Sequence, residues 1–236
     1  MKRRVIQLIS LLIFAVAVDA QSNGIVINGN WSDRVSVSDV NGIPFENKYD
    51  NITGSPFFNP VYKFCKIVLT NDRKFIGIQT KINLAAQETV FITANGIEAY
   101  MPAGMVKEIT YADTSADGVI LLYRFQTGFP AVDKQNNNTF YQVLVEGHIN
   151  LLKLTTKYLT EQKNELSGEI MRLFETYEDY YLFAKDSMKR IKKDKNFILG
   201  ELADNQEAVA DYIRANKLNL KNQAGLVQLF SFYNSL

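Results

Sequence analysis

The sequence contains 236 residues, of which 47% are hydrophobic and 22% are charged, and its formal net charge is +1 at neutral pH. This balance lacks the electrostatic footprint of a nucleic-acid-binding protein, so no nucleic-acid partner is expected. The 15 phenylalanines and 12 tyrosines exclude a disordered chain and suffice for a packed core. The single cysteine excludes an internal disulfide bond.

Residues 1–20 have the pattern of a cleavable signal peptide. Basic residues 2–4 precede an uncharged apolar run at residues 5–18, and Ala20 is one of the small residues that a signal peptidase recognises. A helix that spans a membrane needs about 20 apolar residues, and this run is shorter. We expect cleavage before Gln21, export to the periplasm or beyond, and no transmembrane segment afterwards. The mature chain is expected to carry no lipid, because Cys65 lies far from the cleavage point.

Residues 21–60 are expected to form an irregular N-terminal arm with one or two short strands. They are rich in Asn, Gly, Asp, Ser and Pro, and their apolar residues show no sustained period. At the end of this arm, turn-forming residues flank the adjacent Phe57 and Phe58. Such a combination is typical of a loop that anchors its aromatic rings on a core.

The pattern from residue 61 to residue 191 predicts an antiparallel β domain. Ile76, Ile78 and Ile82 share one parity, which is the alternation of a half-buried strand. Asn95 and Gly96 separate two apolar segments, as in a hairpin whose type I′ turn needs positive φ at both central residues. No helical segment interrupts the series, so an antiparallel meander is expected. Further strands are predicted near residues 64–70, 106–111, 119–125, 139–146, 149–158 and 167–176.

From residue 192 to residue 236 the hydrophobic period changes to that of α-helices. Apolar residues recur on helical stripes around Phe197, Val209 and Leu226, and Asn205 and Asn222 stand where N-caps belong. Three short helices are predicted, and each must pack on the others or on the sheet because it is too short to be stable alone. The predicted fold class is therefore mainly β, α+β overall: an antiparallel β-meander domain followed by a C-terminal helical cap.

Residues that could form a nucleophile and its base are scarce in this sequence. His148 is the only histidine and Cys65 the only thiol, so a catalytic triad would have to be built around them. Gly147 and His148 interrupt two apolar runs, which indicates a turn or bulge. One cysteine and one histidine cannot form a structural zinc site, and no glycine-rich phosphate loop follows a strand. No catalytic residue, metal or cofactor is therefore predicted.

The densest acidic group consists of Glu175, Glu178 and Asp179, which lie among aromatic residues. Paired carboxylates carry out general acid and base chemistry in glycoside hydrolases. Acidic residues are also common in turns, and aromatic residues commonly flank hairpins. We predict a polar hairpin turn here and rank a hydrolase as the less favoured interpretation.

Residues 189–195 form the only basic run of the mature chain. An anionic partner such as a lipid headgroup could meet such a run. A solvated surface where a strand leads into a helix is the more common structure for such a pattern, and we predict that structure here.

Four segments of the sequence together resemble those of a known protein family. They are Gly54–Phe58 before the first long strand, Tyr180–Leu182 in the closing strand, residues 189–195 before the helices, and Phe232–Leu236 at the end of the chain. These segments resemble a family of secreted proteins of the Bacteroidota that has no assigned activity. The similarity covers nearly all of the mature chain and implies a location in a Gram-negative cell envelope. It transfers no functional residue.

The sequence is compatible with functions from different classes. The first is a non-enzymatic binding or structural protein of the cell envelope, with a protein or another ligand as its partner. The second is a carrier that holds an apolar ligand or lipid in a cavity of a curved sheet, and the third is a hydrolase that uses carboxylates. A filled core would favour the first of these over the second. Binding energy concentrates on aromatic residues in loops and at sheet rims. The candidate contact residues are Phe57, Phe58, Tyr177, Tyr180, Tyr181 and Phe183.

Overall fold

The computed structural model describes residue 49 and residues 52–163, 165–166, 168–192 and 194–236. The predicted signal peptide and most of the predicted N-terminal arm lie outside the described residues. The strands are β1 (Ile52–Thr53), β2 (Lys63–Leu69), β3 (Lys74–Asn83), β4 (Glu88–Ile92), β5 (Glu98–Pro102), β6 (Val106–Thr114), β7 (Ile120–Gln126), β8 (Tyr141–Val145), β9 (Asn150–Lys163), β10 (Ile170–Ala184) and β11 (Ser187–Arg190). The helices are α1 (Lys195–Glu201), α2 (Gln206–Ala215) and α3 (Gln223–Tyr233), with 3-10 turns η1 (Ala103–Met105) and η2 (Ala203–Asn205).

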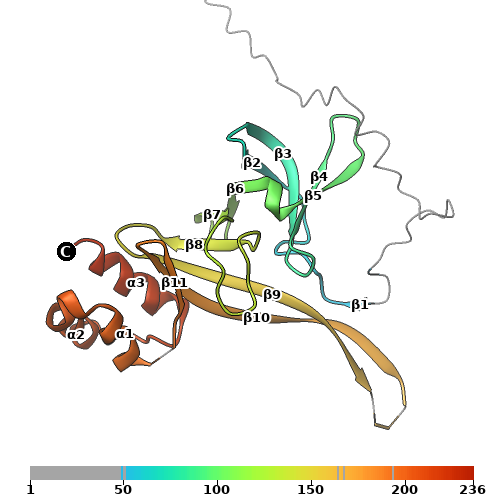
Figure 1. The fold of residues 1–236 in the computed structure, drawn as a ribbon. Helices are drawn as coiled ribbons and strands as arrows, with labels where there is room; N and C mark the ends of the chain where they lie inside the picture. Colours follow the sequence, from blue (N-terminus) through green and yellow to red (C-terminus); the bar gives the residue numbers. More distant parts are fainter. Residues whose placement is uncertain (1–48, 50–51, 164, 167, 193) are drawn as a thin grey trace, which may run out of the picture.

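All described strands belong to one sheet, in the order β1-β10-β9-β8-β7-β6-β2-β3-β4-β5, and β11 also pairs with β10. Every pair is antiparallel except β1 with β10. The predicted mainly β fold with three C-terminal helices is therefore confirmed. The chain departs from a simple meander where β6 returns to pair with β2 instead of continuing from β5. In Figure 1, β8, β9 and β10 lie below the upper strands β2 to β7, and the helices gather at one end.

The three helices pack on one face of the lower strands. Leu226, Leu229 and Phe230 of α3 are fully buried in one cluster with Leu151 of β9 and Leu182 of β10. Burying an aliphatic or aromatic side chain of this size stabilises a fold by about 1.5–3 kcal/mol. Because each helix is short, this contact with the sheet stabilises the helical cap.

Side chains at the helix N-termini explain where the helices begin. Asn222 caps α3 as predicted, since its side chain accepts a hydrogen bond from the N–H of Gly225 at 2.9 Å. Asn205 stands at the N-cap position of α2 but makes no side-chain cap bond, and Asp194 caps α1. Gly225 is required for packing, because a Cβ atom there would lie 2.1 Å from the backbone oxygen of Asn219. Within the described residues, no helix has the length and apolar character needed to cross a membrane.

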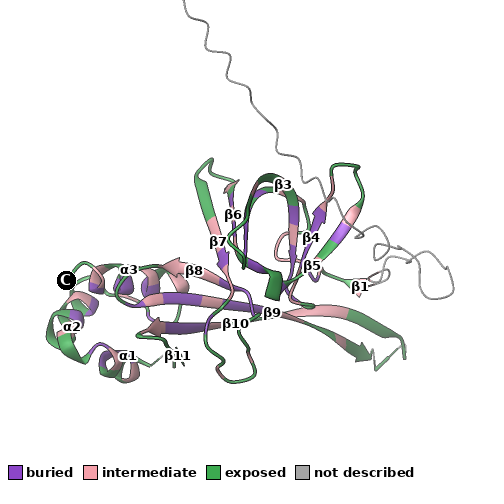
Figure 2. Ribbon diagram, turned by 45° about the horizontal axis from the view of Figure 1, so that its top comes forward, coloured by how far each residue is buried: buried purple, intermediate pink, exposed green. Residues whose placement is uncertain are grey.

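The loop between β7 and β8 covers the opposite face of β9 and β10. Phe129 of this loop stands edge-on to Tyr141 of β8, with ring centres 5.5 Å apart, and Tyr141 stands edge-on to Tyr181 of β10 at the same distance. Leu152 and Leu154 of β9 are buried in the same cluster. The half of the β9–β10 hairpin next to the helices is therefore buried on both faces, as Figure 2 shows in purple.

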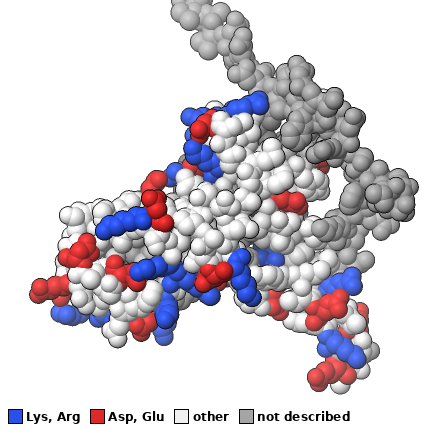
Figure 3. Space-filling model, viewed as in Figure 1, with Lys and Arg blue, Asp and Glu red and all other residues white. Residues whose placement is uncertain are grey.

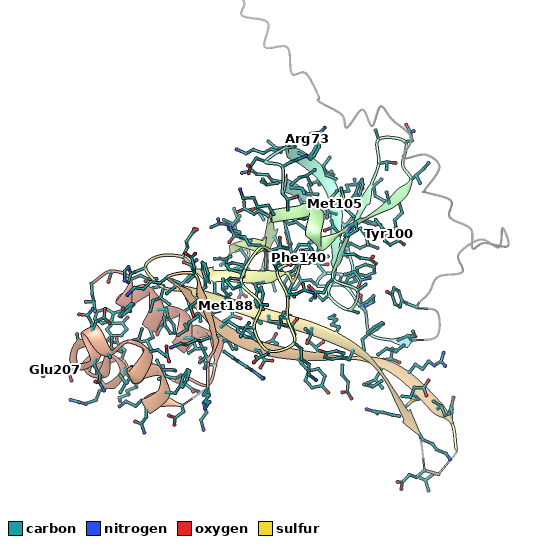
Figure 4. The ribbon with its side chains drawn as sticks, viewed as in Figure 1. Arg73, Tyr100, Met105, Phe140, Met188 and Glu207 are labelled. Atoms are coloured by element: carbon teal, nitrogen blue, oxygen red, sulfur yellow. The ribbon has the colours of Figure 1, made fainter. Side chains whose placement is uncertain are left out.

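The upper strands enclose a separate core. Phe140 lies between these strands and β9 (Figure 4), and its N–H donates to Oε1 of Gln87 at 2.9 Å. This bond connects the upper core to the segment that leads into β8. The buried residues of the upper core are Cys65, Ile67, Leu69, Ile82, Leu84, Ala103, Val106, Ile109, Tyr111, Phe125 and Phe140.

The strand predicted at residues 167–176 ends too early. The sequence predicts a strand at residues 167–176, whereas β10 extends to Ala184 and a tight turn leads into β11. Lys185 and Asp186 form this turn with φ values of 49° and 56°, as a type I′ turn requires. Lysine is not a turn-forming residue, so the sequence pattern gives no signal for this hairpin.

The predicted polar turn around Glu175 is also wrong. Glu175, Glu178 and Asp179 lie in the middle of β10, and the connection between β9 and β10 is formed by residues 164–169. Polar side chains are tolerated in this strand because this stretch of the hairpin is at least partly exposed to solvent. By contrast, the turn predicted at Gly147 and His148 is confirmed between β8 and β9.

Candidate functional site

The structure separates the six predicted contact residues. Phe57 is half-buried against Lys81 of β3, whose Nζ atom lies 4.3 Å from the centre of the ring. Phe58 packs into the upper core, with its ring centre 4.8 Å from that of Phe125 and 5.4 Å from that of Tyr123. Both rings anchor the segment before β2, which agrees with the predicted role of this loop.

Three of the remaining predicted residues contribute to the core of the lower strands. Tyr180 and Tyr181 are buried on opposite faces of β10, because alternate residues of a strand point to opposite sides. The hydroxyl of Tyr181 donates to Asp133 at 3.1 Å, and Phe183 stands edge-on to Phe129 at 5.1 Å. These side chains stabilise the fold and present little surface to a partner.

Tyr177 differs from the other candidates, because half of its side chain is open to solvent (50%). It lies on the outer half of the β9–β10 hairpin, which projects beyond the upper strands (Figure 1). We call this outer half, residues 156–163 and 170–177, the arm. Figure 2 shows that the outer end of the arm is exposed. The register between β9 and β10 assigns every side chain of the arm to one of its two faces.

One face of the arm contains a single charged residue. Tyr158, which is 54% exposed, stands edge-on to Tyr177 with ring centres 5.7 Å apart. The one carboxylate, Glu175, accepts a hydrogen bond from the Tyr177 hydroxyl at 2.6 Å. This hydrogen bond, together with the charge of Glu175, raises the pKa of Tyr177 above its ordinary value. We call this surface the arm face, and its members are Thr156, Tyr158, Thr160, Gln162, Met171, Leu173, Glu175 and Tyr177.

The opposite face of the hairpin carries paired charges. Arg172 contacts Glu161 at 2.9 Å, and Lys153 contacts Glu178 at 2.7 Å. Figure 3 shows blue and red side chains next to each other over this part of the molecule. The two faces of the arm therefore differ in charge. The arm face has one charged residue, whereas the opposite face has four: Lys157, Glu161, Lys163 and Arg172.

The acidic residues that could serve a hydrolase do not converge. Glu178 points to the face opposite Glu175 and Asp179, because the three residues alternate along β10. Asp179 is paired with Arg190 of β11, and Glu178 with Lys153. A pair of carboxylates must flank one scissile bond in a glycoside hydrolase, and this arrangement does not provide such a pair.

The residues considered for nucleophilic catalysis are also separated. Cys65 is buried in the upper core, and its thiol donates to the backbone oxygen of Lys63 at 3.3 Å. His148 is exposed in the turn between β8 and β9. Among the described residues, no group of three or more His, Cys, Asp or Glu side chains is placed to hold a metal ion.

Sequence reasoning missed a polar and aromatic cluster around Lys81. The Nζ atom of Lys81 lies 4.2 Å from the centre of the Tyr62 ring and 3.8 Å from Glu98 of β5, in addition to its contact with Phe57. Burial alone would raise the pKa of Glu98. Hydrogen bonds from Tyr62 and Tyr100 and the charge of Lys81 outweigh that effect, so the pKa is lowered.

This cluster has a structural role in joining three segments of the chain. The ammonium group of Lys81 already contacts the rings of Phe57 and Tyr62, so these two rings do not form an open aromatic cage for a ligand. Figure 4 shows Tyr100 at the outer side of β5. No sequence signal predicts the cluster, since its members are far apart in the chain and meet only through the pairing of β3, β4 and β5.

One hollow of the described surface is polar and open. A depression of about 840 Å³ lies along η2 and the first turns of α2. It is open to solvent and lined by residues 203–208, 210 and 211, which are small or polar. The sheet itself is filled by the side chains of its buried clusters.

Comparison with other proteins adds no assignment. No known family matches the sequence, and no curated protein or solved structure is significantly similar to it. The resemblance to secreted proteins of the Bacteroidota therefore stays a prediction.

Proposed function

We propose that this chain is an exported, non-enzymatic binding protein that engages a partner protein through the arm face. The observation that carries the proposal is the exposed pair of Tyr158 and Tyr177 on a projecting hairpin. Tyrosine is enriched at the energetic centres of protein interfaces, and charged residues are depleted there. The arm face has both properties.

The chemistry of the arm face favours a protein partner over an ionic one. Glu175 is the only charged residue on it, and this carboxylate already accepts a hydrogen bond from Tyr177. The other members of the arm face are threonine, glutamine, methionine and leucine side chains, which a partner can cover without the cost of desolvating a free charge. Removing one central tyrosine from an interface costs about 2 kcal/mol, which weakens binding by roughly 30-fold.

The N-terminal sequence supports export. Basic residues 2–4, the apolar run at residues 5–18 and the small residue Ala20 form the pattern that secretory enzymes recognise. The exported protein should have an intact mass that corresponds to a chain beginning at Gln21. Retention of residues 1–20 in exported material would contradict cleavage at this position.

A face-specific cross-linking experiment tests the binding role. A photoreactive phenylalanine analogue is placed at Tyr177 in one variant and at the next residue, Glu178, in the other. The two probes occupy neighbouring positions of β10 but lie on opposite faces of the hairpin. We expect a discrete adduct in cell envelopes from position 177, its loss when Tyr158→Ala is added, and no such adduct from position 178. Equal adducts from both positions, or none from position 177, would rule out the arm face.

A further inference from the structure

One edge of β7 lacks a partner strand over most of its length. β8 pairs with β7 only at Phe125 and Gln126, so the described chain places no strand beside residues 120–124 on that side. On the other side β7 pairs with β6 from Ile120 to Gln126. Figure 2 shows β7 rising away from β8 with its outer half exposed. The backbone of this outer half is therefore an open edge.

The hydrogen bonds with β6 determine which residues face the open edge. The C=O of Val119 accepts a bond from the N–H of Ser115 at 2.9 Å, so the polar backbone groups of Val119 point toward β6. Backbone groups alternate between the two sides of an antiparallel strand. Ile120, Leu122 and Arg124 therefore direct their N–H and C=O groups outward. These groups have the geometry that a further antiparallel strand would need.

The side chains at this edge are apolar and exposed. Ile120 is 74% exposed and Leu122 71% exposed on the outer face of the sheet, and Leu121 is 39% exposed on the inner face. Val119, just before the strand, is exposed as well. A long, hydrophobic open edge is a template for pairing with another strand, and soluble proteins usually block such edges.

Two other open edges of the described sheet carry charges or proline. β5, at the end of the sheet, carries Glu98 and ends in Pro102. The stretch of β10 between its pairings with β1 and β11 carries Glu175, Glu178 and Asp179. Charged residues and proline on an edge strand oppose pairing. The edge of β7 has neither between Val119 and Tyr123.

We propose that the open edge of β7 pairs with the same edge of a second copy of this chain, antiparallel and centred on Leu121. In this register, Leu121 lies opposite Leu121 of the second copy, and Ile120 lies opposite Leu122. Ile120 and Leu122 exchange backbone hydrogen bonds across the boundary, because both direct their polar groups outward. A twofold interface of this kind brings the same surface of each copy together.

The charges near this edge agree with self-pairing. Arg124 is the only charged residue between Gly118 and Gln126, and the register places it opposite Gly118 of the second copy. Its guanidinium already bonds Glu108 at 2.8 Å and Glu146 at 2.5 Å within its own chain. No like charges oppose each other across the boundary. The apolar side chains on each face meet apolar side chains, which favours association.

Charge variants at the twofold axis test the proposal. Sedimentation velocity of the mature chain, from low micromolar to near-millimolar concentration, should show a monomer–dimer equilibrium. Leu121→Lys and Leu121→Glu should each weaken dimerisation at least tenfold, because like charges then face each other. An equimolar mixture of the two variants should regain the dimer, since opposite charges meet at the axis.

Leu166→Lys provides the matched control, because Leu166 is 99% exposed in the connection between β9 and β10 and lies outside this edge. The control should dimerise like the wild type. Recovery of the dimer in the mixture also shows that both variants fold. A wild type that stays monomeric throughout, a Leu121→Lys variant that dimerises normally, or a mixture that stays monomeric would overturn the proposal. The arm face is not involved, so this result is independent of the proposed binding function.

Discussion

The side-chain amide of Asn234 bonds both backbone groups of Ile149. Its Oδ1 accepts from the N–H of Ile149 at 3.0 Å, and its Nδ2 donates to the C=O of the same residue at 2.9 Å. Asn234 follows α3, and Ile149 is buried in the turn just before β9. This pair fixes the end of the helical cap to the turn between β8 and β9.

Replacing Asn234 with alanine should lower the free energy of unfolding by about 2 kcal/mol, because two backbone groups next to a buried residue lose their partners. Urea denaturation followed by circular dichroism measures the effect. Asn216→Ala is the control, since Asn216 also ends a helix but is exposed and makes its side-chain bond within that helix. Its cost should stay within about 0.5 kcal/mol. Equal costs for both variants would contradict the role of Asn234.

Gly147 should be coupled to Asn234. A Cβ atom at Gly147 would lie 2.6 Å from the Asn234 amide, so Gly147→Ala should destabilise the wild type. In an Asn234→Ala background the amide is absent, and the added methyl group should cost much less. A double-mutant cycle measured by urea denaturation should show this difference. Additive costs would mean that the two residues are not in contact in solution.

The N-cap of α3 should contribute to stability, whereas that of α2 should not. Asn222→Ala removes the bond to the N–H of Gly225 and should cost about 1 kcal/mol. Asn205→Ala is the matched control, because the Asn205 side chain makes no cap bond. Thermal unfolding should show a lower midpoint for Asn222→Ala than for Asn205→Ala. The reverse order would contradict the capping assignment.

Cys65 should be unreactive until the protein unfolds. Burial raises the pKa of this thiol to about 12. At pH 8 only roughly one molecule in ten thousand would carry the reactive thiolate, as a difference of four pH units implies. Ellman's reagent should therefore label the native chain slowly and the urea-unfolded chain at once. Leu166→Cys provides an exposed thiol for comparison and should add one equivalent of fast reaction. Rapid labelling of the native wild type would contradict the buried position.

Acid should destabilise the protein partly through Glu108. Burial alone would raise the pKa of Glu108, but bonds from Arg124 and Gln126 outweigh it and lower the pKa below its ordinary value of 4.5. A carboxyl group with a lowered pKa in the folded state stabilises the protein above its unfolded pKa. This contribution is lost as the pH falls through the folded pKa. The free energy of unfolding should therefore decline from about pH 4.5 downward.

Glu108→Gln should reduce this decline, because it removes the group that titrates. Glu207→Gln is the control, since Glu207 is an exposed residue of α2 (Figure 4). Urea denaturation at a series of pH values between 3 and 7 measures the slopes of both variants. Identical slopes for Glu108→Gln and the wild type would show that this carboxylate does not account for the acid sensitivity.

Short-range patterns predicted the elements well where the signal is local. The hairpin around Asn95 and Gly96, the cap at Asn222 and the helical period after residue 192 depend on residues a few positions apart. The predicted type I′ turn in that hairpin is wrong, because Gly96 has positive φ but Asn95 does not. The turn at Lys185 and Asp186 escaped prediction, because its positive φ values are held by the pairing of β10 with β11 and not by residue type. Local preference is weak compared with such pairing.

The exposure of the candidate contact residues could not be predicted from local sequence patterns. Tyr177, Tyr180 and Tyr181 are indistinguishable as aromatic residues in one segment of the sequence, yet only Tyr177 is open to solvent. Burial of the other two depends on the helices covering one face of β10 and the β7–β8 loop covering the other. Those contacts join residues far apart in the chain, and hydrophobic burial depends on which surfaces meet.

By itself, the sequence determined a mainly antiparallel β chain with three C-terminal helices, because the hydrophobic periods of strands and helices depend only on neighbouring residues. The tertiary structure alone decided that the arm face is exposed, that Lys81 is enclosed by Phe57 and Tyr62, and that β7 keeps an open edge. The physical reason is that exposure and open edges are properties of the whole sheet. They arise from the order in which its strands pair and from what covers each face.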